Sequence, residues 1–166
     1  MLDDGQYETI IEEIETKRGR DVFTQEIRDV FSRLGTVRET LCQITGLFTD
    51  TVITTNYDRL IEQAYETIID KNAILIINGM DESAQPATNQ LSIIKLHGDI
   101  QNPAKCILSK NQYDETYGVD TLDMKRPIPK RLSDHFKNSN LLFLGCSLNN
   151  DLSNGIEKFP VKLYGY

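Results

Sequence analysis

Residues 52–62 read VITTNYDRLIE, and this stretch decides the fold. Its first residues are β-branched, as in a buried strand, its centre is polar, and its last residues resume an apolar pattern with helical spacing. A strand that passes directly into a helix is the unit of an α/β sheet, in which ligands bind at the carboxyl ends of the strands. The stretch therefore predicts an α/β fold with polar side chains at a ligand-binding edge. These side chains are Thr54, Thr55, Asn56 and Asp58.

Two further apolar runs end in the same way. Residues 92–96 read SIIKL and are followed by HGD, and residues 140–144 read NLLFL and are followed by GCSL. Polar residues or glycine thus follow each of three predicted strands at its carboxyl end. This arrangement indicates a functional site as well as a scaffold.

The rest of the chain alternates between helical and strand patterns. Helices are expected at about 7–17, 23–34, 36–48, 57–70, 111–117, 127–137 and 151–158, and strands at 51–54, 73–77, 92–96, 105–108, 140–144 and 161–164. The 166 residues are predicted to form one domain, with a helical segment at 1–50 and an α/β core at 51–166. Because the strand runs are continuously apolar, we expect a Rossmann-like, mostly parallel sheet with helices on both faces.

Composition excludes several classes of function. The formal net charge of −7 argues against direct binding of nucleic acid through its phosphates. No apolar run reaches the length of a membrane span, so no membrane association is expected. The cysteines Cys42, Cys106 and Cys146 are scattered and have no C-x-x-C spacing, which predicts neither a zinc site nor a disulfide framework and favours a reducing cytoplasm.

Each polar residue at the strand ends has a structural and a functional interpretation. Asn56 and Asp58 can cap the helix that follows, although one cap suffices for one helix. His97 is one of only two histidines and is either a buried structural side chain or a general base that titrates near neutral pH. Gly98 permits close approach of a ligand to the backbone. His135 lies in a predicted amphipathic helix, where a surface role is expected.

The residues after the run at 140–144 are also ambiguous. Gly145, Ser147 and Asn149 are typical of a turn. In the functional interpretation, Gly145 lets a nucleotide pack against the backbone and Ser147 donates a hydrogen bond.

Three short motifs, in this order along the chain, resemble those of the sirtuins. TNYD at 55–58 resembles the motif in which Asn and Asp stand two apart, LHG at 96–98 resembles the motif of the catalytic histidine, and GCSL at 145–148 resembles the later G-x-S-L motif. The longer strings TTNYDRLIE, KLHGD and LLFLGCSLNND resemble the bacterial sirtuin-like NAD hydrolases of antiphage defence more than the protein deacylases. The resemblance spans roughly residues 51–151.

The resemblance implies an enzyme that cleaves the nicotinamide–ribose bond of NAD, with NAD as its substrate. Asn56 would hold the nicotinamide ribose or the attacking water, Asp58 would lie near the carboxamide or orient its neighbours, and His97 would be the base. Residues implied in NAD binding are Thr54, Thr55, Gly98, Gly145, Ser147 and Asn149, the last three toward the adenosine end. No metal is implied, and a second copy of the chain or a defence-system protein is the implied partner.

Two departures from the sirtuin pattern leave alternatives open. Thr55 stands where sirtuins carry Gln, and no G-x-G-x-S loop follows an opening strand. Such a loop normally cradles the pyrophosphate. We therefore expect a domain that lacks its first strand and glycine-rich loop, and a chain with little or no activity unless the complete protein is present. The alternatives are a non-catalytic binding or assembly module and, less favoured because zinc-ligand cysteines are missing, an NAD-dependent protein deacylase.

Overall fold

The computed structural model describes residues 6–31, 35–86, 88–119 and 121–144 of the chain. Three strands form one parallel sheet in the order β1-β3-β2, with β1 at Thr51–Thr54, β2 at Ile74–Asn78 and β3 at Leu91–Lys95. The register pairs Lys95 with Thr54 on one side and with Asn78 on the other, so these three residues form the last row of the sheet. The predicted parallel sheet is confirmed for these strands.

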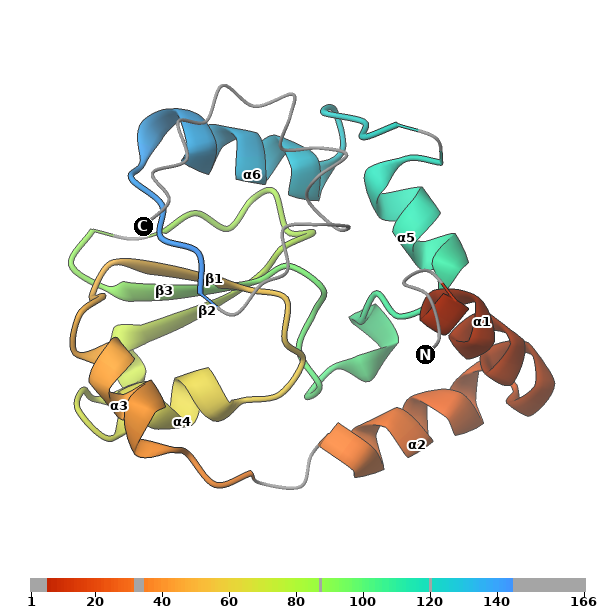
Figure 1. The fold of residues 1–166 in the computed structure, drawn as a ribbon, viewed down its shortest axis with the longest axis horizontal. Helices are drawn as coiled ribbons and strands as arrows, with labels where there is room; N and C mark the ends of the chain where they lie inside the picture. The colour runs from red at the N-terminus through yellow and green to blue at the C-terminus, as the bar shows by residue number, and fades with distance from the viewer. Residues whose placement is uncertain (1–5, 32–34, 87, 120, 145–166) are drawn as a thin grey trace.

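Helices cover both faces of the sheet, as the sequence predicts (Figure 1). One face carries α6 (Pro127–Asn138), and the other carries α3 (Glu39–Thr45) and α4 (Leu60–Glu66). Beside the sheet lie α1 (Gln6–Arg18), α2 (Arg20–Phe31) and α5 (Lys110–Tyr117), and two short 3-10 turns, η1 (Lys71–Ala73) and η2 (Pro103–Lys105), complete the described elements. None of the helices within the described ranges has the length and apolarity that crossing a membrane requires.

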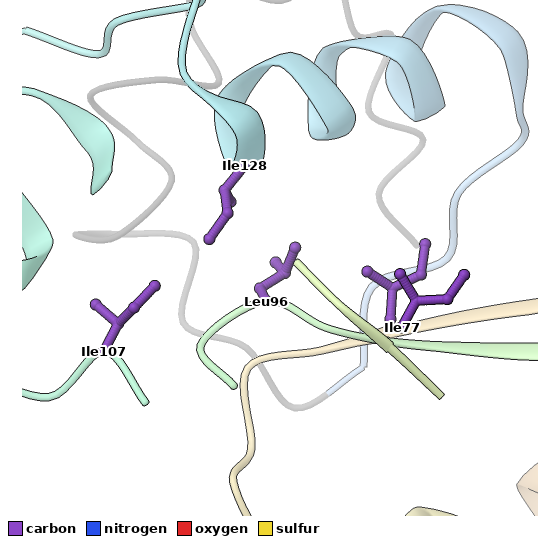
Figure 2. Packing of buried hydrophobic residues seen from close by; sticks show 5 residues of the cluster. Ile77, Leu96, Ile107 and Ile128 are labelled. Atoms are coloured by element: carbon purple, nitrogen blue, oxygen red, sulfur yellow. The ribbon is translucent and has the colours of Figure 1, made fainter. Parts of the chain in front are cut away.

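The central strand β3 is buried along its whole length, which is why its sequence is largely apolar, with Ser92 and Lys95 as its polar residues. Toward α6, its side chains meet a cluster formed by Ile77, Ile94, Leu96, Ile107 and Ile128. Figure 2 shows Ile128 pointing from the first turn of α6 toward Leu96 at the end of β3. Pro127 starts this helix, because the fixed φ of proline suits the first helical position.

The opposite face packs against α4 through Tyr65, Leu91 and Ile93. The buried hydroxyl of Tyr65 donates a hydrogen bond to the carbonyl oxygen of Phe48, 2.6 Å away. α4 is shorter than the predicted helix at 57–70. It begins only at Leu60, whose amide donates to the Asp58 carboxylate. After α4 the chain forms the separate turn η1, where the Asp70 side chain accepts from the Asn72 amide.

Two predicted strands are wrong. Lys105 is the last residue of the turn η2, and residues 106–108 run past the end of β3 without forming a ladder. The Ile107 amide donates to the His97 carbonyl. Residues 140–144 pair with no strand within the described ranges, and Phe143 instead stacks on Phe136 of α6 with ring centroids 5.8 Å apart. The helix predicted at 151–158 and the strand predicted at 161–164 lie outside the described residues.

Candidate functional site

The sheet register brings the ends of β1 and β3 side by side. Thr54 pairs with Lys95, and the Leu96 amide donates to the Thr54 carbonyl at 2.9 Å. Asn56 and His97 each stand two residues beyond this pair. The prediction that they follow adjacent parallel strands at the carboxyl edge is therefore confirmed, and the shared cleft expected there stays a prediction.

The turn after β1 is held by its own side chains. The Asn56 amide donates to the Thr54 hydroxyl at 3.1 Å, and the Leu60 amide donates to the Asp58 carboxylate at 3.0 Å. Asp58 thus accepts from the first amide of α4 in a turn just before the N-cap position, which Arg59 occupies. Thr55 and Asn56 are exposed, so their side chains are accessible to a ligand.

His97 is buried in a cage of tyrosines. Its Nε2 lies 2.8 Å from the Tyr117 hydroxyl and its Nδ1 lies 3.2 Å from the Tyr113 hydroxyl, and only 7 % of the residue is exposed. The two tyrosines stand one helical turn apart on α5, with their rings stacked. Burial lowers the pKa of His97 to about 4, so the imidazole is neutral at pH 7.

Tyr57 completes this cage from the β1 side, with its ring centroid 6.3 Å from that of His97. Its hydroxyl donates to the Ile107 carbonyl at 2.6 Å, and its ring meets Phe31 edge to face. Burial raises the pKa of the Tyr57 hydroxyl well above its usual range. Tyr57 therefore acts as a neutral hydrogen-bond donor that joins the turn after β1 to the segment after η2.

Gly98 has a structural reason to be glycine. Its φ is +97°, and a Cβ there would lie 2.8 Å from the Lys105 carbonyl oxygen and 3.0 Å from the Cys106 Cα. Backbone of the same chain therefore occupies the space that the sequence interpretation reserves for a ligand. Contact between NAD and Gly98 therefore stays a prediction, and it would have to occur on the side of the glycine that faces away from Lys105 and Cys106.

A buried ion pair lies beneath the turn after β1. The Lys95 ammonium is 2.9 Å from the Glu62 carboxylate, and the two side chains are 0 % and 1 % exposed. The same ammonium donates to the carbonyl oxygens of Tyr57, at 3.2 Å, and Asp58. A lysine at the end of an apolar strand thus contacts the turn that carries Asn56.

A cavity of about 480 Å³ opens between α2 and the start of α4. Its charged lining consists of Arg28, Asp58, Arg59, Glu62 and Glu66. Of the predicted site residues that the structure describes, Asp58 lines this cavity, whereas Asn56 and His97 do not. The cavity therefore lies next to the strand edge that carries Asn56.

Other sequence predictions fall partly outside the described ranges. Gly145, Ser147 and Asn149 lie beyond residue 144. Within the described ranges, no three His, Cys, Asp or Glu side chains are grouped as metal ligands. Cys106 is buried, and burial raises its pKa to about 11, which keeps the thiol protonated.

The motifs and the fold agree with a known family. A model of the SIR2-like domain matches residues 50–159, which is more than half of the chain. This chain belongs to the SIR2-like domain family. The match starts at β1 and covers the turn with Asn56, the strand before His97 and the segment at 145–149.

Two curated relatives of this SIR2-like domain carry the same description. The NAD(+) hydrolase ThsA of Bacillus cereus (strain MSX-D12) is 34 % identical over 137 residues, which cover 80 % of this chain and 27 % of that protein. The NAD(+) hydrolase ThsA of Cytobacillus dafuensis is 34 % identical over 98 residues, 59 % of this chain and 20 % of that protein. The chain therefore spans about a quarter or less of the length of these relatives.

Sequence reasoning missed three residues of this SIR2-like domain that contact the predicted site. They are Lys95, Tyr113 and Tyr117. The spacing of the tyrosines by four residues in a predicted helix places them on one face, which is a usable signal. A charge in an otherwise apolar strand is a second signal, because a buried lysine requires acceptors.

Proposed function

We propose that this SIR2-like domain is the part of an NAD hydrolase that cleaves the nicotinamide–ribose bond. The observation that carries the proposal is the register that puts Asn56 and His97 at the ends of adjacent parallel strands. The similarity to two NAD(+) hydrolases supports it. The motif strings further support a role in bacterial antiphage defence.

The reaction sets definite demands on these residues. Water attacks the ribose carbon, the carbon–nitrogen bond breaks, nicotinamide leaves as a neutral molecule and the proton of the water is released. Because the ribose gains oxocarbenium character, the enzyme must position the sugar and deliver water, but it need not protonate the leaving group. One base and one or two oriented polar groups are sufficient.

In this proposal each residue has a role that its environment permits. Asn56 is exposed at the strand end and orients the ribose or the water. His97 is neutral at pH 7, the form that accepts a proton, either directly or through a tyrosine hydroxyl. Its pKa of about 4 differs from the near-neutral titration that the sequence predicts and makes it a weaker base than a free imidazole. Asp58 lines the neighbouring cavity and orients groups near the carboxamide.

The remaining contacts and the cellular setting belong to the same proposal. Thr54, Thr55 and Gly98 would contact NAD near the strand ends, and Gly145, Ser147 and Asn149 would contact its adenosine end. No metal takes part. The protein acts in the cytoplasm, which the scattered cysteines favour, as a homo-oligomer or with a defence-system partner.

A second candidate function is a non-catalytic binding or assembly module with the same fold. The observation that favours it is that tyrosine hydroxyls occupy both ring nitrogens of His97. Such a module would bind NAD or a protein partner without breaking a bond.

Nicotinamide release from NAD by the full-length gene product separates the two functions. His97→Ala should lower the rate by about 10²–10⁴-fold, because it removes the general base. Asn56→Ala should lower it by about 10²-fold, because it removes a group that positions the ribose or the water. The matched control is His135→Ala. It changes the second histidine of the chain, which lies on α6, and should retain activity. Full activity of His97→Ala would end the catalytic assignment, and an inactive wild-type protein that binds NAD would favour the module.

A further inference from the structure

The ammonium of Lys95 uses all three of its hydrogens within the protein. An ammonium group has three donors and no acceptor. Its three acceptors here are the Glu62 carboxylate and the carbonyl oxygens of Tyr57 and Asp58. Since the side chain is 0 % exposed, no donor is left for water.

Two of these three bonds hold main-chain carbonyls of one turn. The Tyr57 carbonyl also accepts from the Ile100 amide at 3.1 Å, so the turn is tied to the segment after His97 as well. Asn56 immediately precedes the first of these carbonyls. The Tyr57 carbonyl belongs to the Tyr57–Asp58 peptide plane, the second plane after Asn56. Fixing this carbonyl and that of Asp58 restrains the backbone on the C-terminal side of Asn56, and with it the position of the Asn56 side chain.

Stability alone does not account for this pair. A buried ion pair loses the hydration of both ions, and replacement of such a pair by well-packed apolar residues is often neutral or stabilising. Glu62 also has a second cation, the Arg59 Nε at 3.6 Å, while Asp99 lies 3.9 Å from the Lys95 ammonium. An apolar pair could not donate hydrogen bonds to the carbonyls of Tyr57 and Asp58, as the Lys95 ammonium does.

We propose that Lys95 is a positioning residue that orients Asn56 for NAD cleavage by anchoring the carbonyls of Tyr57 and Asp58. The inference rests on the proposed function for its catalytic consequence, but the anchoring itself can be measured without turnover. Lys95 acts only through the backbone of the turn and touches neither substrate nor reacting atoms.

The test uses a double variant, Lys95→Met/Glu62→Leu, in the full-length gene product. Replacing both ions removes the two fully buried charges together, and the charges that lose a distant partner, Arg59 and Asp99, keep access to water with side chains 28 % and 18 % exposed. The melting temperature should therefore stay close to that of the wild type. The rate constant kcat for nicotinamide release should fall about 10²-fold, since misplacement on the order of 1 Å has that effect, and KM for NAD should change less. Hydrogen exchange of residues 55–62 should become faster, because the amides of Asn56 and Leu60 are bonded within the anchored turn.

A matched control lies at the other end of the same strand. Ser92 is fully buried and its hydroxyl has no hydrogen-bond partner among the described residues. Ser92→Ala should leave kcat and the exchange of residues 55–62 unchanged. If the apolar pair does not fold, Lys95→Gln/Glu62→Gln provides a neutral polar pair that shortens the anchor, and the same criteria apply.

The outcomes separate this inference from the proposed function. Normal kcat in a folded double variant overturns the positioning role, and so does unchanged exchange of residues 55–62. If the wild-type protein releases no nicotinamide, the proposed function fails. The exchange measurement then decides the anchoring: faster exchange in the double variant than in Ser92→Ala supports it, and equal exchange overturns it.

Discussion

The Nε2 atom of His97 lies 2.8 Å from the hydroxyl oxygen of Tyr117, a residue of the helix α5. This contact ties the predicted base at the end of β3 to a helix that begins 13 residues further along the chain. A water or ribose hydroxyl that reacts with His97 must either replace a tyrosine hydroxyl or exchange its proton through one. The chemistry of His97 is thus controlled by α5.

Removal of the Tyr117 hydroxyl should destabilise the fold more than removal of the Tyr113 hydroxyl. Tyr117→Phe leaves a buried imidazole nitrogen without this partner, which typically costs about 1–3 kcal/mol of unfolding free energy. The contact from Tyr113 to His97 is longer, 3.2 Å, so the loss of this contact should cost less, while Tyr113 also bonds to Tyr57. Urea denaturation of both variants, with Tyr7→Phe at an exposed position as the control, measures the difference. An equal loss in all three variants would contradict the importance of the His97 contacts.

Stability should fall as the pH is lowered from about 6.5 to about 4. The pKa of His97 is about 4 in the folded state because of burial, and close to 6.5 when unfolded. Between these values the unfolded state binds more protons, so the free energy of unfolding decreases with falling pH, by about 3 kcal/mol in total. Below pH 4 both states are protonated at His97 and its contribution stays constant.

Denaturant titrations across pH 4–8 test this prediction. His97→Gln keeps a donor and an acceptor for the two tyrosines but cannot titrate, so its unfolding free energy should vary much less with pH. His135 is the control: its pKa is also lowered, chiefly by burial, but the residue is only partly buried, and His135→Gln should flatten the profile less. A wild-type profile that matches that of His97→Gln would contradict the lowered pKa.

Local sequence patterns predicted most of the described elements. The β-branched run at 51–54 and the apolar run at 92–96 became β1 and β3, because burial on both faces of a parallel sheet demands such runs. The run at 140–144 is equally apolar, yet a strand also needs a hydrogen-bonding partner. Apolarity cannot supply that partner, and Phe143 packs on α6 instead.

The site was predictable only where it follows from topology. Parallel strands end at one edge, so Asn56 and His97 were expected together from their positions after β1 and β3. The contacts that hold them were not, since Lys95 meets a carboxylate 33 residues earlier and His97 meets hydroxyls up to 20 residues later. Such pairs depend on how helices pack on the sheet, which no local pattern specifies.

We expect purified protein to contain no stoichiometric zinc. Zinc binds the thiolate form of cysteine, and the buried Cys106 keeps its proton because its pKa is raised to about 11. Elemental analysis after purification without chelators should give far less than one zinc per chain. About one zinc per chain would contradict this prediction and revive the deacylase interpretation.

Gly98→Ala should destabilise the fold more than Gly19→Ala, although both glycines have positive φ, +97° and +82°. Each substitution forces an L-residue into the left-handed half of conformational space, which costs about 1–2 kcal/mol. At Gly19 nothing lies within 4 Å of the added Cβ, so conformational strain is the only term. At Gly98 the added Cβ would also lie 2.8 Å from the Lys105 carbonyl oxygen, in the backbone segment whose Ile107 amide donates to the His97 carbonyl.

The comparison of the two variants isolates the steric term. Gly98→Ala should lower the free energy of unfolding by more than Gly19→Ala, and it should speed hydrogen exchange at Ile107, whose amide donates to the His97 carbonyl at 2.9 Å. Urea denaturation gives the first quantity and exchange mass spectrometry the second. Equal destabilisation by both variants, with unchanged exchange at Ile107, would mean that the backbone at Lys105 moves away from the added Cβ without loss of stability. Gly98 would then be free to serve a bound ligand, as the sequence alone suggested.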